Sequence, residues 1–280
     1  DVKSSLQRLG YRGLLTSIFK NIVLYFSRKN VDHVFAINNA GEKIFKKLKF
    51  KSVSLSPLGF DSTIFYPNPI TRETKRKELS IEAHQVVIAY IGRTVFEKGI
   101  HILLESLAQL LLNKDWVLML DKFAATKTSY QEKIIQNVND LGLQDRVKYF
   151  DTPHEMVAQY MNAADVVVIP SISTSKWVEQ YGRVAPEAMA CGKLVLASNT
   201  GALPEIIGDT GLMFEESNTK QLSEILLRSI TSYSDFDGIR LMAQKRANDP
   251  YYFKVTCIFV LIFIPASTGR TSAAVTAGLP

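Results

Sequence analysis

Two glutamates, Glu179 and Glu187, stand eight positions apart with a glycine and a proline between them. Gly182 allows a loop backbone to approach a ligand closely, and Pro186 suits the first position of a helix. Glu187 then falls in the first helical turn, beside backbone N–H groups that lack partners within the helix. Such N–H groups attract phosphate, whereas carboxylates accept hydrogen bonds from hydroxyls. The spacing therefore predicts a binding site for a sugar phosphate or a nucleotide.

The same two carboxylates permit other interpretations. As a pair they can serve as acid and base, or as nucleophile and acid, in a hydrolase. Taken singly, Glu179 is explained as a solvated loop charge, and Glu187 as a carboxylate that complements a helix dipole. The glycine and the proline between the two glutamates favour recognition of hydroxyl groups.

A second candidate site lies in the segment AYIGRTVFEKGIHILLESL, where a predicted strand ends at Gly92. Arg93 and Lys98 stand in the loop that follows, and Gly99 opens the next helix. Two cations five residues apart can converge on a diphosphate and neutralise the charge on a departing group. Two solvated surface charges explain this motif equally well when it is considered alone.

The order of apolar and polar segments predicts the elements that position these residues. Strands are expected at residues 86–91, 117–120, 147–150, 166–170, 194–197 and 212–214, and helices at 99–112, 130–141, 154–162, 186–191 and 219–232. Short strands at 34–37 and 53–55 and a helix at 40–48 precede them. Continuous apolar strands that alternate with helices are typical of a parallel sheet covered on both faces, so the predicted class is α/β. Ligands bind such sheets beyond the carboxyl ends of the strands, where both candidate loops lie.

These motifs, taken in order, resemble one known family. The segments IGR…EKG, the Glu179-to-Glu187 pair and EAMACGKLVLASNTGALPEIIGDTGLMFE look like the C-terminal half of the family 4 retaining glycosyltransferases of the GT-B fold. The resemblance is specific over residues 86–230 and weaker over residues 11–65, where VDHVFAIN and SPLGFD carry it. It implies a Rossmann-like doubly wound parallel sheet, the C-terminal half of a GT-B fold, with a remnant of a second α/β domain.

The family resemblance also implies a role for each candidate residue. Arg93 and Lys98 would hold the diphosphate of a nucleotide diphosphate sugar, and Glu179 would contact the donor sugar. These three residues form the implied catalytic set, while Glu187 would accept hydrogen bonds from the ribose. The full donor site implied by the resemblance consists of Gly92, Arg93, Lys98, Glu179, Gly182, Arg183, Val184 and Glu187.

The same resemblance extends to the other ligands. The segment DTPHE at residues 151–155 would contact the nucleobase. Neither a metal nor a cofactor is implied, because the two cations neutralise the charge that develops on the diphosphate. The implied acceptor is a glycan or a lipid-linked molecule, such as a precursor of a bacterial surface polysaccharide.

Three features depart from the family pattern. Asp121 and Lys122 stand where the family often has a glycine-rich turn, and most of the N-terminal domain is missing. After KVT the sequence enters an apolar run in place of the usual final helix, so a fragment or an altered reading frame would explain both ends. We expect residues 1–65 to be a remnant of the acceptor-side domain, 66–84 a linker, 85–245 the nucleotide-sugar-binding domain, and 246–280 a loosely held tail.

Charge and cysteine content indicate the cellular setting. The net charge of +6 is uneven, with 15 Lys and Arg against 7 Asp and Glu in residues 1–85, but no nucleic-acid motif is present. A basic amphipathic helix is expected at residues 11–29. The favoured interpretation is that it packs on a sheet; the alternative is peripheral contact with the inner face of a membrane.

Cys191 and Cys257 have neither metal-ligand spacing nor a disulfide framework, which predicts a reducing compartment such as the cytoplasm. No apolar run reaches the roughly 18 residues that a spanning helix needs.

Three hypotheses about function follow. The first is sugar transfer from a nucleotide diphosphate sugar with retention of configuration. The second is a nucleotide-sugar-binding module that has no turnover, because a cleft with one wall cannot orient two substrates. The third is a related GT-B enzyme, either a sugar-nucleotide epimerase or a phosphorylase.

Overall fold

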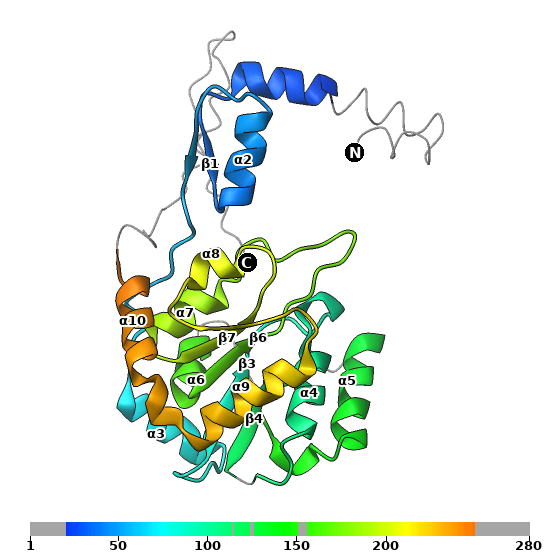
Figure 1. The fold of residues 1–280 in the computed structure, drawn as a ribbon, viewed down its shortest axis with the longest axis vertical. Helices are drawn as coiled ribbons and strands as arrows, with labels where there is room; N and C mark the ends of the chain where they lie inside the picture. The colour runs from blue at the N-terminus through cyan, green and yellow to red at the C-terminus, as the bar shows by residue number, and fades with distance from the viewer. Residues whose placement is uncertain (1–20, 114, 124–125, 151–155, 250–280) are drawn as a thin grey trace. The chain divides into compact units, whose positions relative to one another are not determined.

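A computed structural model describes residues 21–113, 115–123, 126–150 and 156–249 (Figure 1). The segment 151–155, predicted to contact the nucleobase, and the tail at 250–280 lie outside these residues. The chain forms two compact units, which divide between Ser56 and Pro57. Among the described residues, no helix is both long enough and apolar enough to cross a membrane.

In its described residues, the smaller unit contains two strands and two helical segments. Residues 21–30 are helical, and β1 (Val34–Ala36), α2 (Asn39–Lys47) and β2 (Val53–Leu55) follow. The two strands pair in parallel, as the α/β pattern requires. In the helical segment, Ile22, Val23 and Phe26 are 49%, 47% and 58% exposed, so the predicted packing of this helix on a sheet is not found in its described part.

The larger unit is built on six parallel strands. Their order in the sheet is β5 (Val147–Phe150), β4 (Trp116–Asp121), β3 (Val86–Tyr90), β6 (Val166–Ile169), β7 (Leu194–Ser198) and β8 (Leu212–Phe214). Ile88 of β3 lies opposite Leu118 on one side and Val166 on the other. The chain order therefore reverses direction between β3 and β6, which makes the sheet doubly wound and Rossmann-like and confirms the predicted fold class.

Helices cover both faces of this sheet (Figure 1). On one face lie α4 (Ile100–Ala108), α5 (Ser129–Asp140) and α9 (Thr219–Thr231), and on the other lie α3 (Pro69–Glu78), α6 (Val157–Ala163), α7 (Val184–Ala190) and α10 (Asp237–Ala247). The remaining short elements are η1 (Phe96–Lys98), η2 (Gln144–Arg146), α8 (Leu203–Ile207) and η4 (Tyr233–Phe236). All residues of β3, β6 and β7 are buried, which explains why these strands read as unbroken apolar runs.

The expected linker at residues 66–84 contains a helix, α3, that belongs to the larger unit. Asn68 caps this helix by accepting from the backbone N–H of Thr71 at 3.0 Å, and Pro69 occupies its first position. Arg72 and Arg76 extend from α3 to backbone carbonyls near the end of α6. Polar and proline-rich composition suggested a connector, but these polar groups cap the helix and attach it to the core.

Helix α7 begins two residues before its predicted start at Pro186. The proline is accommodated because it lies in the first turn, where no intrahelical N–H bond is required of it. Glu187 remains in the first turn, as predicted. The short helix α8 was not predicted, since five residues are too few to show a helical period.

Candidate functional site

The two candidate loops meet at the centre of the sheet. One loop follows β3 and carries Gly92, Arg93 and Lys98; the other follows β6 and carries Glu179 and its neighbours. Because β3 and β6 are adjacent and the strand order reverses between them, their carboxyl ends border the crevice in which doubly wound sheets bind ligands. The sequence motifs are 81 positions apart, from Lys98 to Glu179, but the fold places them side by side.

Lys98 and Glu179 form an ion pair in this crevice. The Lys98 Nζ lies 2.5 Å from the Glu179 Oε2. The Ser171 hydroxyl donates to the same oxygen at 3.0 Å, and the backbone N–H of Gly182 donates to Oε1 at 3.1 Å. The Glu179 side chain is only 6% exposed. Both carboxylate oxygens are thus held by donors, so the position of this group is fixed before any ligand arrives.

Two glycines allow the backbone segments around this pair to touch. Gly99, with φ +65°, lies against β6: a Cβ atom on it would be 1.8 Å from the Pro170 carbonyl oxygen. Gly201, with φ +57°, lies against the second loop, where a Cβ atom would be 2.0 Å from the Glu179 carbonyl oxygen. No residue with a Cβ atom fits at these separations, so the two glycines set the spacing between the loops.

Arg93 and Gly92 are exposed in the loop after β3. The Tyr90 hydroxyl donates to the Arg93 carbonyl oxygen at 2.8 Å, which anchors the backbone of this loop to the buried strand. Burial raises the pKa of the Tyr90 phenol, so this group stays a hydrogen-bond donor at ordinary pH. The Arg93 side chain is therefore attached to a fixed backbone while its guanidinium is open to solvent.

Glu187 is buried at the start of α7, with its side chain 9% exposed. Burial raises the pKa of its carboxyl from 4.5 to about 7, and Arg183, whose Nη2 lies 3.7 Å from Oε1, only partly opposes this rise. Because the folded-state pKa exceeds the unfolded value, Glu187 increasingly lowers stability as pH rises from 4.5 through about 7. A ligand that donates hydrogen bonds to the carboxylate would relieve this cost.

Three residues of the site have no motif that singles them out in the sequence. Ser171 and Gly201 act through contacts with Glu179 that are visible only once distant loops are adjacent. Trp177 faces the ion pair, with the Lys98 Nζ 5.1 Å from its ring centroid. An aromatic ring next to a carboxylate and an ammonium group is a common way to bind the apolar face of a sugar.

The end of β4 differs from the glycine-rich turn that the family often has. Asp121 pairs with Phe150 in the sheet, and the backbone N–H of Lys122 donates to the Phe150 carbonyl oxygen at 2.8 Å. These residues therefore extend the ladder between β4 and β5 instead of turning. Within the described residues, no group of three or more His, Cys, Asp or Glu side chains is placed to hold a metal ion.

The fold defines the class of protein: a Rossmann-like domain of the GT-B type, whose strand order reverses between β3 and β6. The family described as Glycosyl transferases group 1 matches residues 71–241, and this chain belongs to that family.

Curated relatives agree with this assignment. A D-inositol 3-phosphate glycosyltransferase of Corynebacterium efficiens is 32% identical over 176 residues, which cover 58% of this chain and 39% of the relative. A lipopolysaccharide 1,2-N-acetylglucosaminetransferase of Salmonella typhimurium is 32% identical over 170 residues, with coverage of 59% and 43%. The matched region thus spans less than half the length of these relatives.

Solved structures show the same architecture. The Anabaena protein HepE in complex with UDP and glucose has a TM-score of 0.71 and 26% identity, and the match covers 84% of this chain and 62% of HepE. A sucrose-phosphate synthase from Thermosynechococcus elongatus has a TM-score of 0.68 and 26% identity, with coverage of 82% and 57%.

Proposed function

We propose that this chain is the donor-binding part of a family 4 retaining glycosyltransferase. It would move a sugar from a nucleotide diphosphate sugar to a glycan or lipid-linked acceptor. The observation that carries this proposal is the Lys98–Glu179 ion pair at the switch point of the sheet, where a cation and a hydroxyl acceptor are adjacent. The likeness to HepE, which was solved with UDP and glucose, supports a nucleotide-sugar donor.

The proposed roles follow from the chemistry of each group. Arg93 and Lys98 bind the diphosphate and stabilise the charge that develops on it as it leaves. Glu179 accepts hydrogen bonds from hydroxyls of the donor sugar through the lone pairs that its present donors leave open. The acceptor attacks from the face that the diphosphate leaves, which retains the configuration without a protein nucleophile and without a metal.

The second half of the predicted donor site binds the nucleoside. Glu187 accepts hydrogen bonds from the ribose hydroxyls, and the backbone at Gly182, Arg183 and Val184 approaches the sugar and phosphates. The positive φ of Gly182, +72°, gives this backbone its turn toward the buried Glu179. These assignments explain why a carboxylate is buried at the start of α7 with only one weakly placed cation beside it.

Calorimetric titration with UDP-glucose, UDP, GDP-mannose and GDP tests the proposal. We expect one nucleotide series to bind, and we expect Lys98→Met to weaken that binding by about tenfold or more, since it removes a charge-assisted hydrogen bond. Lys245→Met, which removes an exposed cation on α10, is the matched control and should leave affinity unchanged. If none of the four ligands binds, the proposal is wrong.

A second candidate function rests on how much of the curated relatives the match covers. The match to the curated relatives covers 39–43% of their length, so a binding module without turnover is a specific alternative. Donor binding with neither transfer nor donor hydrolysis would support this module. Conversion of the free donor sugar to an epimer, detected by proton NMR in the absence of acceptor, would instead identify an epimerase.

Glu187 should make nucleotide binding depend on pH. Ribose hydroxyls donate to the ionised carboxylate, and the ionised fraction grows as pH rises through a pKa of about 7. We therefore expect the Kd for UDP to fall by up to about tenfold between pH 6 and pH 8. Calorimetry at a series of pH values measures this change.

Glu187→Gln provides the control for this pH dependence. The terminal phosphate of UDP also titrates in this range, but its contribution is the same for both proteins, so the difference between their pH profiles isolates Glu187. The variant should bind UDP more weakly at pH 8 and should show the smaller change. Identical profiles for the two proteins would contradict the proposed role of Glu187 in ribose recognition.

We also propose that the helical segment at residues 21–30 contacts an anionic membrane surface. It exposes Ile22, Val23 and Phe26 and carries Arg28 and Lys29, a combination that favours the interface of anionic lipids. The chain should sediment with phosphatidylglycerol vesicles, and Val23→Ser with Phe26→Ser should reduce this binding several-fold.

The control for vesicle binding is Ile70→Ser, which removes an apolar side chain that is 78% exposed on α3. It should leave vesicle binding unchanged. Equal binding to phosphatidylcholine vesicles, or equal loss in the control, would show that the basic amphipathic segment is not responsible.

A further inference from the structure

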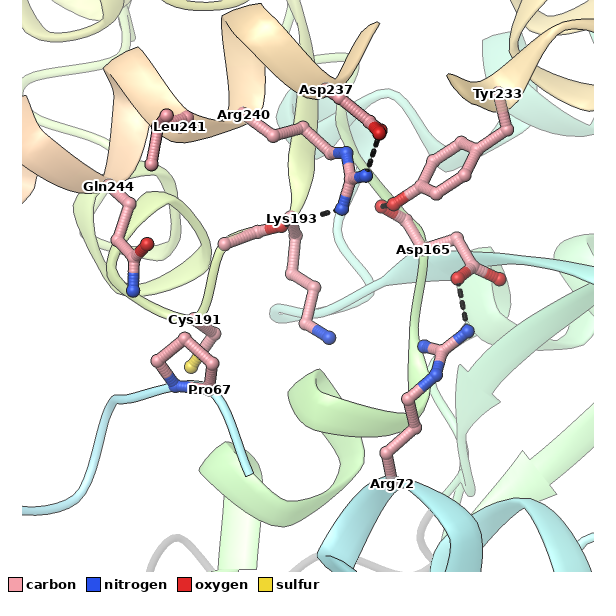
Figure 2. A pocket seen from close by; sticks show the side chains of 11 residues that line it. Pro67, Arg72, Asp165, Cys191, Lys193, Tyr233, Asp237, Arg240, Leu241 and Gln244 are labelled. Carbon is pink, nitrogen blue, oxygen red and sulfur yellow. Dashed lines mark hydrogen bonds and ion pairs between the residues drawn. The ribbon is translucent and has the colours of Figure 1, made fainter. Parts of the chain in front are cut away.

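A cavity of about 470 Å³ lies at the amino ends of β6 and β7 (Figure 2). Asp165 and Lys193, which line it, directly precede these two strands. The candidate donor site lies beyond the carboxyl ends of β3 and β6. The cavity and the candidate donor site are therefore at opposite ends of the parallel strands. The volume is within the range of pockets that bind small molecules.

Cations outnumber carboxylates around this cavity. Arg72 of α3, Lys193 before β7 and Arg240 of α10 supply three positive charges, while Asp165 and Asp237 supply two negative ones. Asp237 is an exposed residue that pairs with Arg240. Three separate elements therefore direct cations toward one space (Figure 2).

Both oxygens of the Asp165 carboxylate already have partners. The Arg72 Nη2 lies 2.5 Å from its Oδ1, and Arg76, one turn further along α3, pairs with Oδ2. The backbone N–H of Val87 also donates to Oδ2, at 2.7 Å. With Arg76 included, four cations share two carboxylates, and the region near Lys193 retains an excess of positive charge.

Donor groups at this cavity are left without acceptors. The Lys193 residue is 7% exposed, and its ammonium donates to the Asn162 carbonyl oxygen at 2.8 Å. An ammonium group has three N–H bonds, so two of them have no acceptor among the described residues. The Arg240 Nε is buried and also lacks a hydrogen-bond partner in the described part of the chain. Buried donors of this kind are costly unless a ligand or water satisfies them.

The titration of Lys193 agrees with the geometry. The pKa of its ammonium is lowered from 10.5 to about 8, mainly by burial and also by the charges of Arg72 and Arg76, while Asp165 acts in the opposite direction. An anion beside Lys193 would favour its charged form. The Lys193 ammonium is thus held among groups whose positive charges exceed their negative charges.

We propose that this cavity binds a phosphoryl group, either as free phosphate or as the terminal phosphate of a small molecule. Lys193 and the guanidinium of Arg240 line the cavity from two sides, and Arg240 pairs through Nη2 with Asp237 and donates through Nη1 to the Gly192 carbonyl oxygen at 3.5 Å. The several acceptor oxygens of a phosphate can accept from the remaining donors of both groups. Pro67 and Leu241 form an apolar part of the wall, which leaves room for an organic moiety. Figure 2 shows the Lys193 amino group within the space between Pro67, Cys191 and Arg72.

Calorimetry and thermal unfolding with inorganic phosphate at constant ionic strength test this proposal. The full chain should bind phosphate, and both Lys193→Met and Arg240→Met should raise the Kd by about tenfold or more, because each removes a charge-assisted donor. Lys98→Met, in the candidate donor site, should retain the binding. Lys245→Met, on α10 but outside the cavity lining, is the matched surface control.

Separate ligands identify the source of the phosphoryl group. Tighter binding of a hexose phosphate than of inorganic phosphate would identify a phosphorylated metabolite, and equal binding would identify free phosphate. Absence of phosphate binding, equal binding of acetate, or loss of binding in Lys98→Met with retention in Lys193→Met would overturn the proposal. Should Lys193→Met fail to fold by circular dichroism, Arg240→Met decides the outcome, since its side chain is 26% exposed and its removal leaves the core intact.

Discussion

Alanine at both Arg93 and Lys98 should abolish donor binding. The double variant removes the two cations that we assign to the diphosphate, and each charge-assisted contact contributes about 1.5–3 kcal/mol. The expected result is a rise of about 100-fold or more in the Kd for the nucleotide sugar. The same variant should show no measurable sugar transfer under conditions in which the wild-type sequence supports it.

Calorimetry with the nucleotide sugar measures this loss. Lys98→Ala also leaves Glu179 without its cation, so the double variant must be shown by circular dichroism and urea unfolding to be folded. Arg93→Ala alone separates the two effects, because Arg93 is exposed and its removal leaves the Lys98–Glu179 pair intact. Wild-type affinity in the double variant would refute the assignment of both cations.

Gly99→Ala should disrupt the site without removing any charge. A Cβ atom at this position would lie 1.8 Å from the Pro170 carbonyl oxygen, and the φ of +65° is unfavourable for alanine. The loop after β3 and the end of β6 must therefore separate. We expect a loss of about 3 kcal/mol in the free energy of unfolding and a loss of donor binding.

Urea unfolding and calorimetry together measure the effect of Gly99→Ala. Gly238→Ala is the matched control, because no atom lies within 4 Å of its added Cβ and the residue sits in helix α10. Alanine there should be neutral or slightly stabilising, by up to about 1 kcal/mol. Equal stability of the two alanine variants would show that the contact with Pro170 does not constrain the fold.

The central strands could be predicted from the sequence because they are buried on both faces and read as unbroken apolar runs. The runs at 86–91 and 166–170 predict strands, and the observed β3 and β6 begin at the same residues and end one residue earlier. The cations and glycines of the two candidate loops could also be recognised in the sequence. Their charge and their backbone freedom are properties of the residue type itself. The donor site itself, by contrast, stays a prediction, although the fold brings Lys98 and Glu179 together.

Other parts could not be predicted because their cause lies in distant contacts. Helix α3 is polar and begins at a proline, and its basic residues Arg72 and Arg76 are explained by the carbonyls at the end of α6. Ser171 and Gly201 matter through Glu179, which is eight residues from the first and in a different loop from the second.

The adjacency of β3 and β6 also bears on how the chain is made. Ile88 pairs with Val166, so one edge of β3 has no partner until the ribosome has added the chain as far as β6. Such a long-range pairing is slow to form, and an unpaired apolar strand edge can associate with other chains in the meantime. Of the strand pairs in this sheet, the one at the switch point therefore joins the segments that are farthest apart in the sequence.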